Sequence, residues 1–565
     1  MTAGGQSFGE TRSFGCRRGK ALAHESLRQK DKVTSTGTGC LFADRARCTV
    51  RISFWRSIME AFFDKLASIN SVINDFVWVK IGLFLLIGSG ILLTCCTKFF
   101  QITQLKHWWK MTIGSLFVRD SNATKKTDEK TISQFQALCT ALAATIGTGN
   151  IAGVSAAIVI GGPGAVFWMW FAAFFGMMTN FSENILGIYF RRRNTDGEWS
   201  GGAMYYLKDG LGSYKGCKGI GSVLATLFAI FAMLASFGIG NMGQVNKITL
   251  NLEAAFFKNV SLGTIAGIPV INLIIGVVLM ILGGLIIIGG LQRIAAVAER
   301  IVPFMAIAYI IGAVAVFFMN IQSAGAMFAS IFRFAFGVKA VAGGAAGVAI
   351  SQVITQGCTR GVFSNEAGLG SSVMVHSSSN VKEPVKQGMW GVFEVFFDTF
   401  VVCTFTAIVV MSSGCIDLET GLAMPGVNDA TLVSQAFGKV FGPAGEMFIA
   451  VAMLLFAFTT ILGWSQYGAK AVEYLFGDKG VKVYKVIFVL MIISGAVMTS
   501  SLAWDISDTF NGLMMIPNLI GVVSLLPLVA KITSNYVARH IKGENIKPLL
   551  SYDAAITAEM MNVED

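Results

Sequence analysis

Charged residues are scarce in this sequence. Asp, Glu, Lys and Arg make up 14% of the 565 residues, whereas 54% are hydrophobic, and the mean hydropathy is +0.64. Because soluble domains carry about 25% charged residues, this composition excludes an ordinary soluble globular protein. Many apolar stretches run ~20 residues, the length with which a helix crosses a hydrocarbon core. The sequence therefore predicts an all-α integral membrane protein.

Residues that carry metal or redox chemistry are few and dispersed. The four histidines form no HExxH motif, and the ten cysteines form no CxxC pair. Neither a zinc site, a disulfide framework nor metalloprotease chemistry is indicated. The net charge of +11 does not indicate a nucleic-acid partner, because basic residues collect in the cytoplasmic loops of membrane proteins.

Hydropathy predicts about 11 transmembrane helices: one peripheral N-terminal helix and ten that divide into two halves of five. They lie near 77–97, 134–161, 164–190, 219–245, 268–290, 298–320, 325–358, 388–412, 444–474, 483–502 and 509–532. The predicted division of the chain is 1–58, an extension; 59–133, the peripheral helix and a basic cytoplasmic loop; 134–320 and 321–532, two inverted repeats; and 533–565, a cytoplasmic C-terminal tail.

Loop charges orient this arrangement. Of the basic residues assigned to connections and the C-terminal tail, 25 fall on one side, and three, Lys247, Lys258 and Lys439, on the other. The side rich in lysine and arginine is expected to be cytoplasmic. With an odd number of spans, the C-terminus is then cytoplasmic and the N-terminus outside.

Residues 1–58 do not fit this pattern. They are polar, hold eleven basic residues and contain no long apolar core, which excludes a secretory signal. Eleven basic residues outside also oppose the charge rule, whereas an amphipathic segment begins at Met59. We expect a disordered or non-native extension before Met59. A genuine basic tail is the alternative.

The stretch ATIGTGNIAG, residues 144–153, interrupts an otherwise apolar span with Gly147, Thr148, Gly149 and Asn150. Glycine costs a helix roughly 1 kcal/mol relative to alanine, and a buried amide needs a partner. An unwound turn here would present backbone N–H groups to a carboxylate and free carbonyls to a cation. The alternative is close helix packing through a GxxxG pair, Gly149 and Gly153.

The second half also opens on a glycine-rich segment, FAFGVKAVAGGAAG at 334–347, with Gly337, Gly343 and Gly344. Interrupted helices at corresponding positions of two halves indicate a transporter site at the bilayer midplane. This symmetry is inferred from hydropathy and glycine placement, since residue identities do not repeat.

Further polar residues lie inside predicted spans. Gln244 could turn its amide to the cavity or lie at the water interface, and Thr459 and Thr460 could bind a ligand or bond to carbonyls of their own helix. Trp464, one turn further, is either a cavity wall or core.

Three acids, Glu183, Glu394 and Asp398, fall within spans and are functional candidates by position. Asp398 is the most deeply placed. We expect it to act as a gate or as a structural hydrogen-bonding residue rather than as a ligand.

At these residues the chain resembles the alanine or glycine:cation symporter family, the sodium:alanine symporters. The resemblance is collinear over roughly 59–540. It rests on ALCTALAATIGTGNIAGVSAAI at 137–158, GGPGAVFWMW at 161–170, EWSGGAMYYL at 198–207, GNMGQ at 240–244, RGVFSNEAGLGSS at 360–372 and FAFTTILGW at 456–464.

The resemblance implies a fold similar to the leucine transporter, with five-plus-five inverted repeats, and import of a small neutral amino acid, alanine or glycine, with sodium across the bacterial cytoplasmic membrane by a monomer. It places sodium between the carbonyls of Ala143 and Ile146 and the hydroxyls of Thr459 and Thr460. Substrate would lie against Gly147, Thr148, Gly149, Asn150, Gln244 and Phe336. The segment RFAFGVKA departs from the proline-containing pattern expected after that phenylalanine.

Two alternatives to sodium-coupled import stay open at this point. Proton coupling, or exchange by the same fold, would make Thr459 and Thr460 ordinary helix residues. An intramembrane enzyme is disfavoured, because no His–Cys or His–Ser cluster occurs at helical spacing.

A chain that starts at Met59 is expected to insert and transport as well as the full chain. The reason is the break in charge and composition at this residue. Membrane insertion and labelled-alanine uptake at equal expression check this. Failure of the shortened chain to insert, beside a working 565-residue form, would show that residues 1–58 are needed.

Overall fold

The computed structural model describes residues 64–118, 123–125, 130–260, 262–265, 268–336, 350–426, 431–498 and 502–562. The chain separates into two units, Met1–Ser68 and Ile69–Asp565, and all elements discussed below belong to the second. The predicted extension 1–58 and the glycines at 337, 343 and 344 lie outside the described residues.

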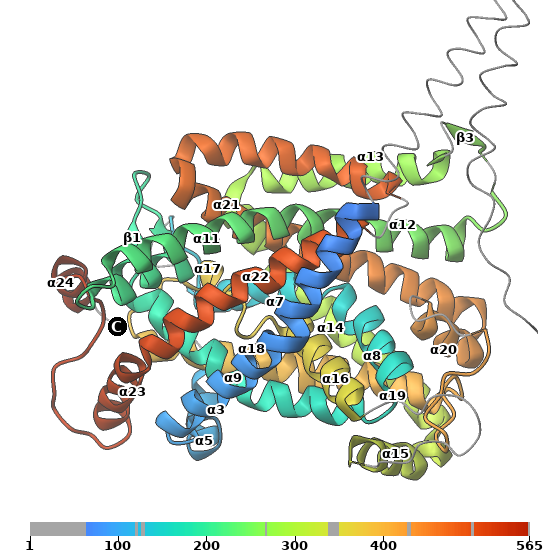
Figure 1. Cartoon of the computed structure of the whole chain (residues 1–565), viewed down its shortest axis with the longest axis horizontal. Coiled ribbons are helices and arrows are strands. Elements are labelled where there is room, and N and C mark those ends of the chain that lie inside the picture. Colours follow the sequence, from blue (N-terminus) through green and yellow to red (C-terminus); the bar gives the residue numbers. More distant parts are fainter. Residues whose placement is uncertain are drawn as a thin grey trace, which may run out of the picture. The chain divides into compact units, whose positions relative to one another are not determined.

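The second unit is almost entirely helical (Figure 1). Its helices are η1 Phe76–Gly82, α3 Leu83–Cys96, α4 Phe100–Thr103, α5 Leu105–Met111, α6 Ile113–Leu116, α7 Gln134–Thr145, η2 Gly149–Gly153, α8 Val154–Gly161, α9 Ala165–Tyr189, α10 Ala203–Tyr205, η3 Tyr206–Gly210, η4 Leu211–Ser213, α11 Lys218–Phe237, η5 Gly238–Met242, α12 Gly243–Phe256, α13 Val270–Ile287, α14 Gly290–Met319, η6 Ile321–Ser323, α15 Ala324–Phe336, α16 Ile350–Asn365, α17 Val373–His376, α18 Pro384–Val395, η7 Phe396–Cys403, α19 Thr404–Ser412, α20 Leu432–Phe441, α21 Pro443–Val497, α22 Leu502–Ser524, α23 Leu526–His540 and α24 Ala554–Asn562.

Two short antiparallel strand pairs complete the described structure. Strand β1 (Arg192–Arg193) pairs with β2 (Trp199–Ser200), and β3 (Thr264–Ile265) pairs with β4 (Ile268–Pro269). Both pairs are hairpins in connections between long helices, so the all-α class predicted from composition is confirmed.

Eight described helical stretches are long and apolar enough to cross a membrane, and the bent pair of α7 with η2 and α8 makes a ninth candidate. One of the eight, α21, has 55 residues and turns at Gly477, whose φ is +70°, so it covers two of the predicted spans. The protein is therefore a multi-pass membrane protein. The count of eleven and the inverted repeat stay predictions.

Long helices pack side by side around the middle of the chain. Helix α9 contacts α16 and α18, while α21 contacts α7, α11, α12 and α13, and α22 runs along η1 and α3 (Figure 1). The outer face of α13 exposes Ile274, Val278, Ile281, Leu282 and Leu285. Apolar side chains at this helical spacing suit contact with lipid.

Buried Arg191 ties two connections together. Its guanidinium donates to the carbonyls of Ser377 (3.2 Å) and Ser379 (2.6 Å), and lies 4.0 Å from the ring centroid of Trp199. Burial lowers the pKa of Arg191 to about 9, so the side chain stays protonated at neutral pH. The connection after α9 is thereby fixed to the segment that follows α17.

The structure corrects the predicted end of the span 325–358. Helix α16 continues to Asn365, and Arg360 lies within it rather than in a connection. Arg360 is one of the 25 basic residues assigned to the cytoplasmic side, because the predicted span ends at 358. It is therefore removed from that count. The chain unwinds after α16, where Glu366, Gly368 and Gly370 have φ of +56°, +93° and +74°.

The predicted C-terminal tail has structure of its own. Helix α23 follows α22 directly, and residues beyond it return to the protein, where Leu550, Ile556 and Met560 form a buried cluster with Trp199. The tail therefore packs against the β1–β2 connection.

Candidate functional site

The first core helix is broken where the glycines and the asparagine stand. Helix α7 begins with a capping box between Ser133 and Gln136 and ends before Ile146, whose ψ is 86°. The half-helices on the two sides of the break differ in direction by 53°. A tight turn of this kind exposes backbone groups that a continuous helix would pair.

Asn150 redirects one of these backbone groups. The N–H of Gly147, which would bond to the carbonyl of Ala143 in a continuous helix, donates instead to Oδ1 of Asn150 at 2.9 Å. The carbonyl of Ala143 thereby loses its helical donor, and Ala143, Ile146 and Asn150 are all fully buried. The break thus leaves the buried carbonyl oxygen of Ala143 without its helical hydrogen bond.

Helix α21 lies against this break. A Cβ added at Gly147 would overlap Oγ1 of Thr460, and one added at Gly463 would overlap Ala144. Glycine is therefore required at Gly147 by the close approach of Thr460. Thr460 is 2% exposed, and its hydroxyl donates to the carbonyl of Phe456 at 2.9 Å.

Thr459 faces a different neighbour. Its hydroxyl lies 2.9 Å from the carbonyl of Leu455 and 3.6 Å from the sulfur of Met305. Both threonines thus bond to their own helix, as the alternative interpretation expected. A hydroxyl that donates to a carbonyl keeps its lone pairs, so these bonds leave each Oγ1 able to accept or to bind a cation.

Gln244 joins the same place from the third core span. Its Oε1 lies 3.4 Å from the N–H of Thr148, and its Nε2 donates to the carbonyl of Ile239 at 3.0 Å. Gln244 is 3% exposed and belongs to the interior rather than to the water interface. Trp464 packs directly against Gly240, near Gln244, since a Cβ added at Gly240 would overlap the side chain of Trp464.

Asp398 has partners that the sequence could not identify. Its carboxylate accepts from Nδ2 of Asn150 at 2.6 Å, from the hydroxyl of Ser364 at 2.9 Å and from that of Thr399 at 3.0 Å. These donors come from η2, α16 and η7, and all are buried. Asp398 therefore connects the two places at which the chain unwinds, which agrees with a structural role.

Phe336 is not brought to these residues. It is 57% exposed and packs its ring on Phe167 at 4.7 Å and on Trp168 at 6.0 Å. The aromatic side chain beside the break is Phe363, on α16. A Cβ added at Gly149 would lie 3.3 Å from Cδ1 of Phe363.

The two glycines of the possible packing pair, Gly149 and Gly153, differ in their neighbours. A Cβ added at Gly153 would meet nothing within 4 Å, so no helix among the described residues approaches there. Gly149 lies close to α16, since a Cβ added there would meet the ring of Phe363 and the backbone of Ser364. The two glycines therefore have different surroundings, and the choice between packing and substrate binding at Gly149 stays a prediction.

The other two intramembrane acids are paired with amides. Glu394 accepts from Asn180 and lies 2.9 Å from Nε2 of His376, while Glu183 accepts from Asn518. All are fully buried. In the described structure these bonds engage one carboxylate oxygen of each acid, and the other oxygen, Oε2 of Glu183 and Oε1 of Glu394, has no hydrogen-bond partner.

Sequence reasoning missed Phe363, Ser364 and Asn365 as part of the site. Asn365 donates to Thr399 and accepts from the N–H of Ala367, which holds the second unwound turn in place. A related signal was present, since NEAGLG at 365–370 combines an asparagine with two glycines, although here the glycines follow the amide and in GTGN at 147–150 they precede it.

The oxygen atoms at the first break suit a hard cation. Carbonyl and hydroxyl oxygens are the ligands that such ions prefer. Among the residues that the structure describes, no group of three His, Cys, Asp or Glu side chains could hold a metal ion. The chemistry of the break thus fits an alkali cation better than a transition metal.

Comparison with known proteins gives consistent matches. The model of the sodium:alanine symporter family matches residues 63–549. The sodium/alanine symporter AgcS of Methanococcus maripaludis is 41% identical over 472 residues, covering 83% of this chain and 97% of that protein. The probable sodium/glutamine symporter GlnT of Bacillus subtilis is 35% identical, covering 85% of this chain and 92% of that protein.

Among solved structures, the crystal structure of MhsT in complex with L-phenylalanine resembles this chain with a TM-score of 0.47 and 14% identity. The similarity covers 72% of this chain and 99% of that one.

Proposed function

The chain belongs to the sodium:alanine symporter family, a family of cation-coupled amino acid transporters and not of enzymes, and on that premise we propose that it imports alanine or glycine together with sodium. One observation carries the proposal. At the break after α7, the N–H of Gly147 bonds to Asn150 instead of to the carbonyl of Ala143, and Gly147 lies directly against the hydroxyl of Thr460.

In this proposal the sodium ion binds the carbonyls of Ala143 and Ile146 and the hydroxyls of Thr459 and Thr460. The ion stabilises the unwound turn, because it replaces the helical donor that Asn150 removed. Sodium and substrate would then favour the same conformation of the break, and each would raise the affinity for the other.

The substrate lies beyond Gly147, against Thr148, Gly149, Asn150 and Gln244. Its carboxylate meets the positive end of the half-helix that starts at Gly149. We propose Phe363, in place of Phe336, as the wall that faces the substrate side chain. Since Phe363 and Trp464 close the space next to Gly149 and Gly240, the arrangement favours a small side chain.

Uptake of labelled alanine and glycine into proteoliposomes tests the proposal. A sodium gradient should drive uptake above the equilibrium level, whereas a proton gradient of equal size without sodium should not. Uptake that follows the proton gradient would instead support the proton-coupled alternative. Counterflow without either gradient would support exchange.

We also propose that the C-terminus is cytoplasmic, the N-terminus outside and the protein a monomer in a bacterial cytoplasmic membrane. In a variant whose ten native cysteines are replaced with serine, a single cysteine introduced at exposed Glu544 should react with an impermeant maleimide only after the cells are permeabilised. Labelling in intact cells would reverse the orientation.

Replacing Thr460 with valine is expected to raise the sodium concentration for half-maximal uptake by about tenfold, and replacing Thr459 as well should raise it further. Valine keeps the shape but removes a hard oxygen ligand, and tenfold corresponds to about 1.4 kcal/mol. The measurement is initial uptake against sodium at equal expression.

Ser465→Ala is the matched control, because this buried hydroxyl on the same helix also bonds to its own backbone, at 2.6 Å from the carbonyl of Leu462. It should leave sodium dependence unchanged. Unchanged dependence in the threonine variants would remove them from the site.

A further inference from the structure

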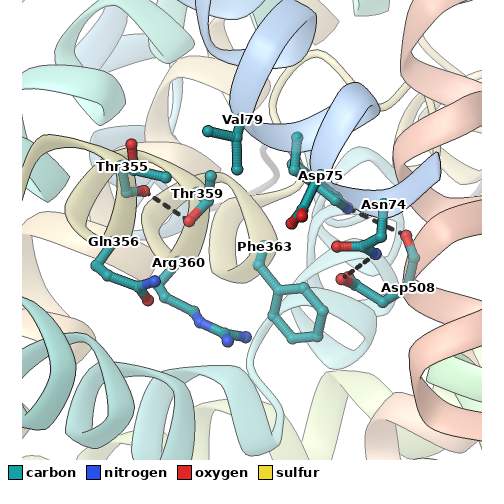
Figure 2. A pocket seen from close by; sticks show the side chains of 10 residues that line it. Asn74, Asp75, Val79, Thr355, Gln356, Thr359, Arg360, Phe363 and Asp508 are labelled. Carbon is teal, nitrogen blue, oxygen red and sulfur yellow. Dashed lines mark hydrogen bonds between the residues drawn. The ribbon is translucent and has the colours of Figure 1, made fainter. Parts of the chain in front are cut away.

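A polar cavity lies between η1, α16 and α22, apart from the buried residues at the break Gly147–Asn150. It is partly open and has a volume of ≈ 160 Å³. Asn74, Asp75, Arg360, Phe363 and Asp508 are among the residues that line it (Figure 2). At about 30 Å³ per water molecule, this volume corresponds to about five waters. That number is close to the six non-hydrogen atoms of alanine.

Opposite charges line this cavity. Arg360 comes from α16, Asp75 from the residue before η1 and Asp508 from α22, and Figure 2 shows their charged ends around Phe363. Asp508 accepts one hydrogen bond, from Nδ2 of Asn74 at 3.0 Å. Within the described ranges, Arg360 and Asp75 form no ion pair or side-chain hydrogen bond.

This arrangement suits a molecule that carries both charges. A guanidinium recognises a carboxylate through paired N–H donors, and a carboxylate accepts from an ammonium. A simple anion would leave two aspartates uncompensated beside it, and a simple cation would lie beside Arg360. A small zwitterion satisfies all three groups at once.

Phe363 lies between this cavity and the break at Gly147–Asn150. It follows Arg360 by three residues on α16, so both lie on the same side of that helix. It lines the cavity on one side and is the nearest neighbour of Gly149 on the other. The ring therefore separates the cavity from the proposed substrate position.

We propose that this cavity is a second, outer binding site for a zwitterionic amino acid. Arg360 binds the carboxylate, Asp75 and Asp508 bind the ammonium, and Phe363 is the partition through which the amino acid reaches the break. The proposal rests on the proposed function for the identity of the amino acid, but not on sodium coupling.

Equilibrium binding of labelled alanine to the purified full chain tests the site. In Gly149→Val, where the inner position is blocked, alanine should still bind, and unlabelled lactate, which lacks the ammonium, should displace it at least tenfold less well than alanine. Adding Arg360→Gln or Asp75→Asn should weaken the remaining binding at least tenfold. Asp75 is exposed, so its replacement does not disturb packing.

Arg333→Gln in the same background is the matched control. Arg333 donates to the carbonyl of Glu419 at 3.0 Å and does not line the cavity, so its loss should leave binding unchanged. Absence of alanine binding to folded Gly149→Val, or equal binding with and without Arg360, would overturn the outer site. Those results, beside sodium-driven uptake by the unsubstituted chain, would leave the proposed function standing, whereas absent uptake would refute the function itself.

Discussion

Replacing Gly149 with valine is expected to abolish uptake and to weaken alanine binding at the inner position by at least about 100-fold, while the protein stays folded in the membrane. The added Cβ alone lies 3.3 Å from Cδ1 of Phe363, and the two methyl groups of valine extend into the same space. A 100-fold loss corresponds to about 2.7 kcal/mol. Because the φ of Gly149 is not positive, the effect comes from occupied space rather than from backbone strain.

Gly153→Val provides the control for this prediction. It places the same side chain in the same short helix, η2, but a Cβ there meets nothing within 4 Å. Uptake by Gly153→Val should remain near that of the unsubstituted protein. Initial uptake is measured beside alanine affinity per folded molecule and melting temperature.

The helix-packing interpretation forecasts the reverse for Gly149→Val. It requires a lower melting temperature with nearly normal affinity in the folded fraction. That outcome would remove Gly149 from the substrate position. The outer site proposed above retains some alanine in this variant, so inner binding is assessed by uptake and by the affinity left after Arg360→Gln is added.

Asp398→Ala is expected to have the second large effect, a loss of several kcal/mol in stability together with loss of uptake. The substitution removes the carboxylate that accepts from buried Asn150, Ser364 and Thr399, at about 1–3 kcal/mol for each donor left unpaired. Asn150 and Ser364 keep only a weak acceptor, the sulfur of Cys403. Freed from Asp398, Asn150 no longer holds the N–H of Gly147 in place. The melting temperature of the purified protein and alanine uptake are the measurements.

Asp398→Asn separates a structural role from ion binding. Asparagine keeps the shape and one acceptor oxygen, and the hydroxyls of Ser364 and Thr399 can accept from its amide. It should therefore recover part of the stability and leave the sodium concentration for half-maximal uptake unchanged. A strong rise in that concentration would make Asp398 a sodium ligand, and native stability of Asp398→Ala would show that it does not organise the two breaks.

Much of this protein follows from short-range features of its sequence. Long apolar runs and few charges determine a helical membrane protein, because backbone groups in lipid must bond within their own segment. The first break is also readable locally, since glycines and an asparagine inside an apolar span disrupt the helix wherever it packs. This is why the break at Gly147–Asn150 could be predicted from the sequence.

Only the tertiary structure decided which residues contact the break at Gly147–Asn150. The glycines after Phe336 and those after Asn365 are equally permissive for unwinding, and the sequence could not distinguish which segment would lie beside Gly149. Asp398 gains its role from Asn150 and Ser364, which lie 248 and 34 residues away in the chain. Such contacts depend on how η7 packs on η2 and on α16, and side-chain packing between distant helices leaves no periodic trace in either segment.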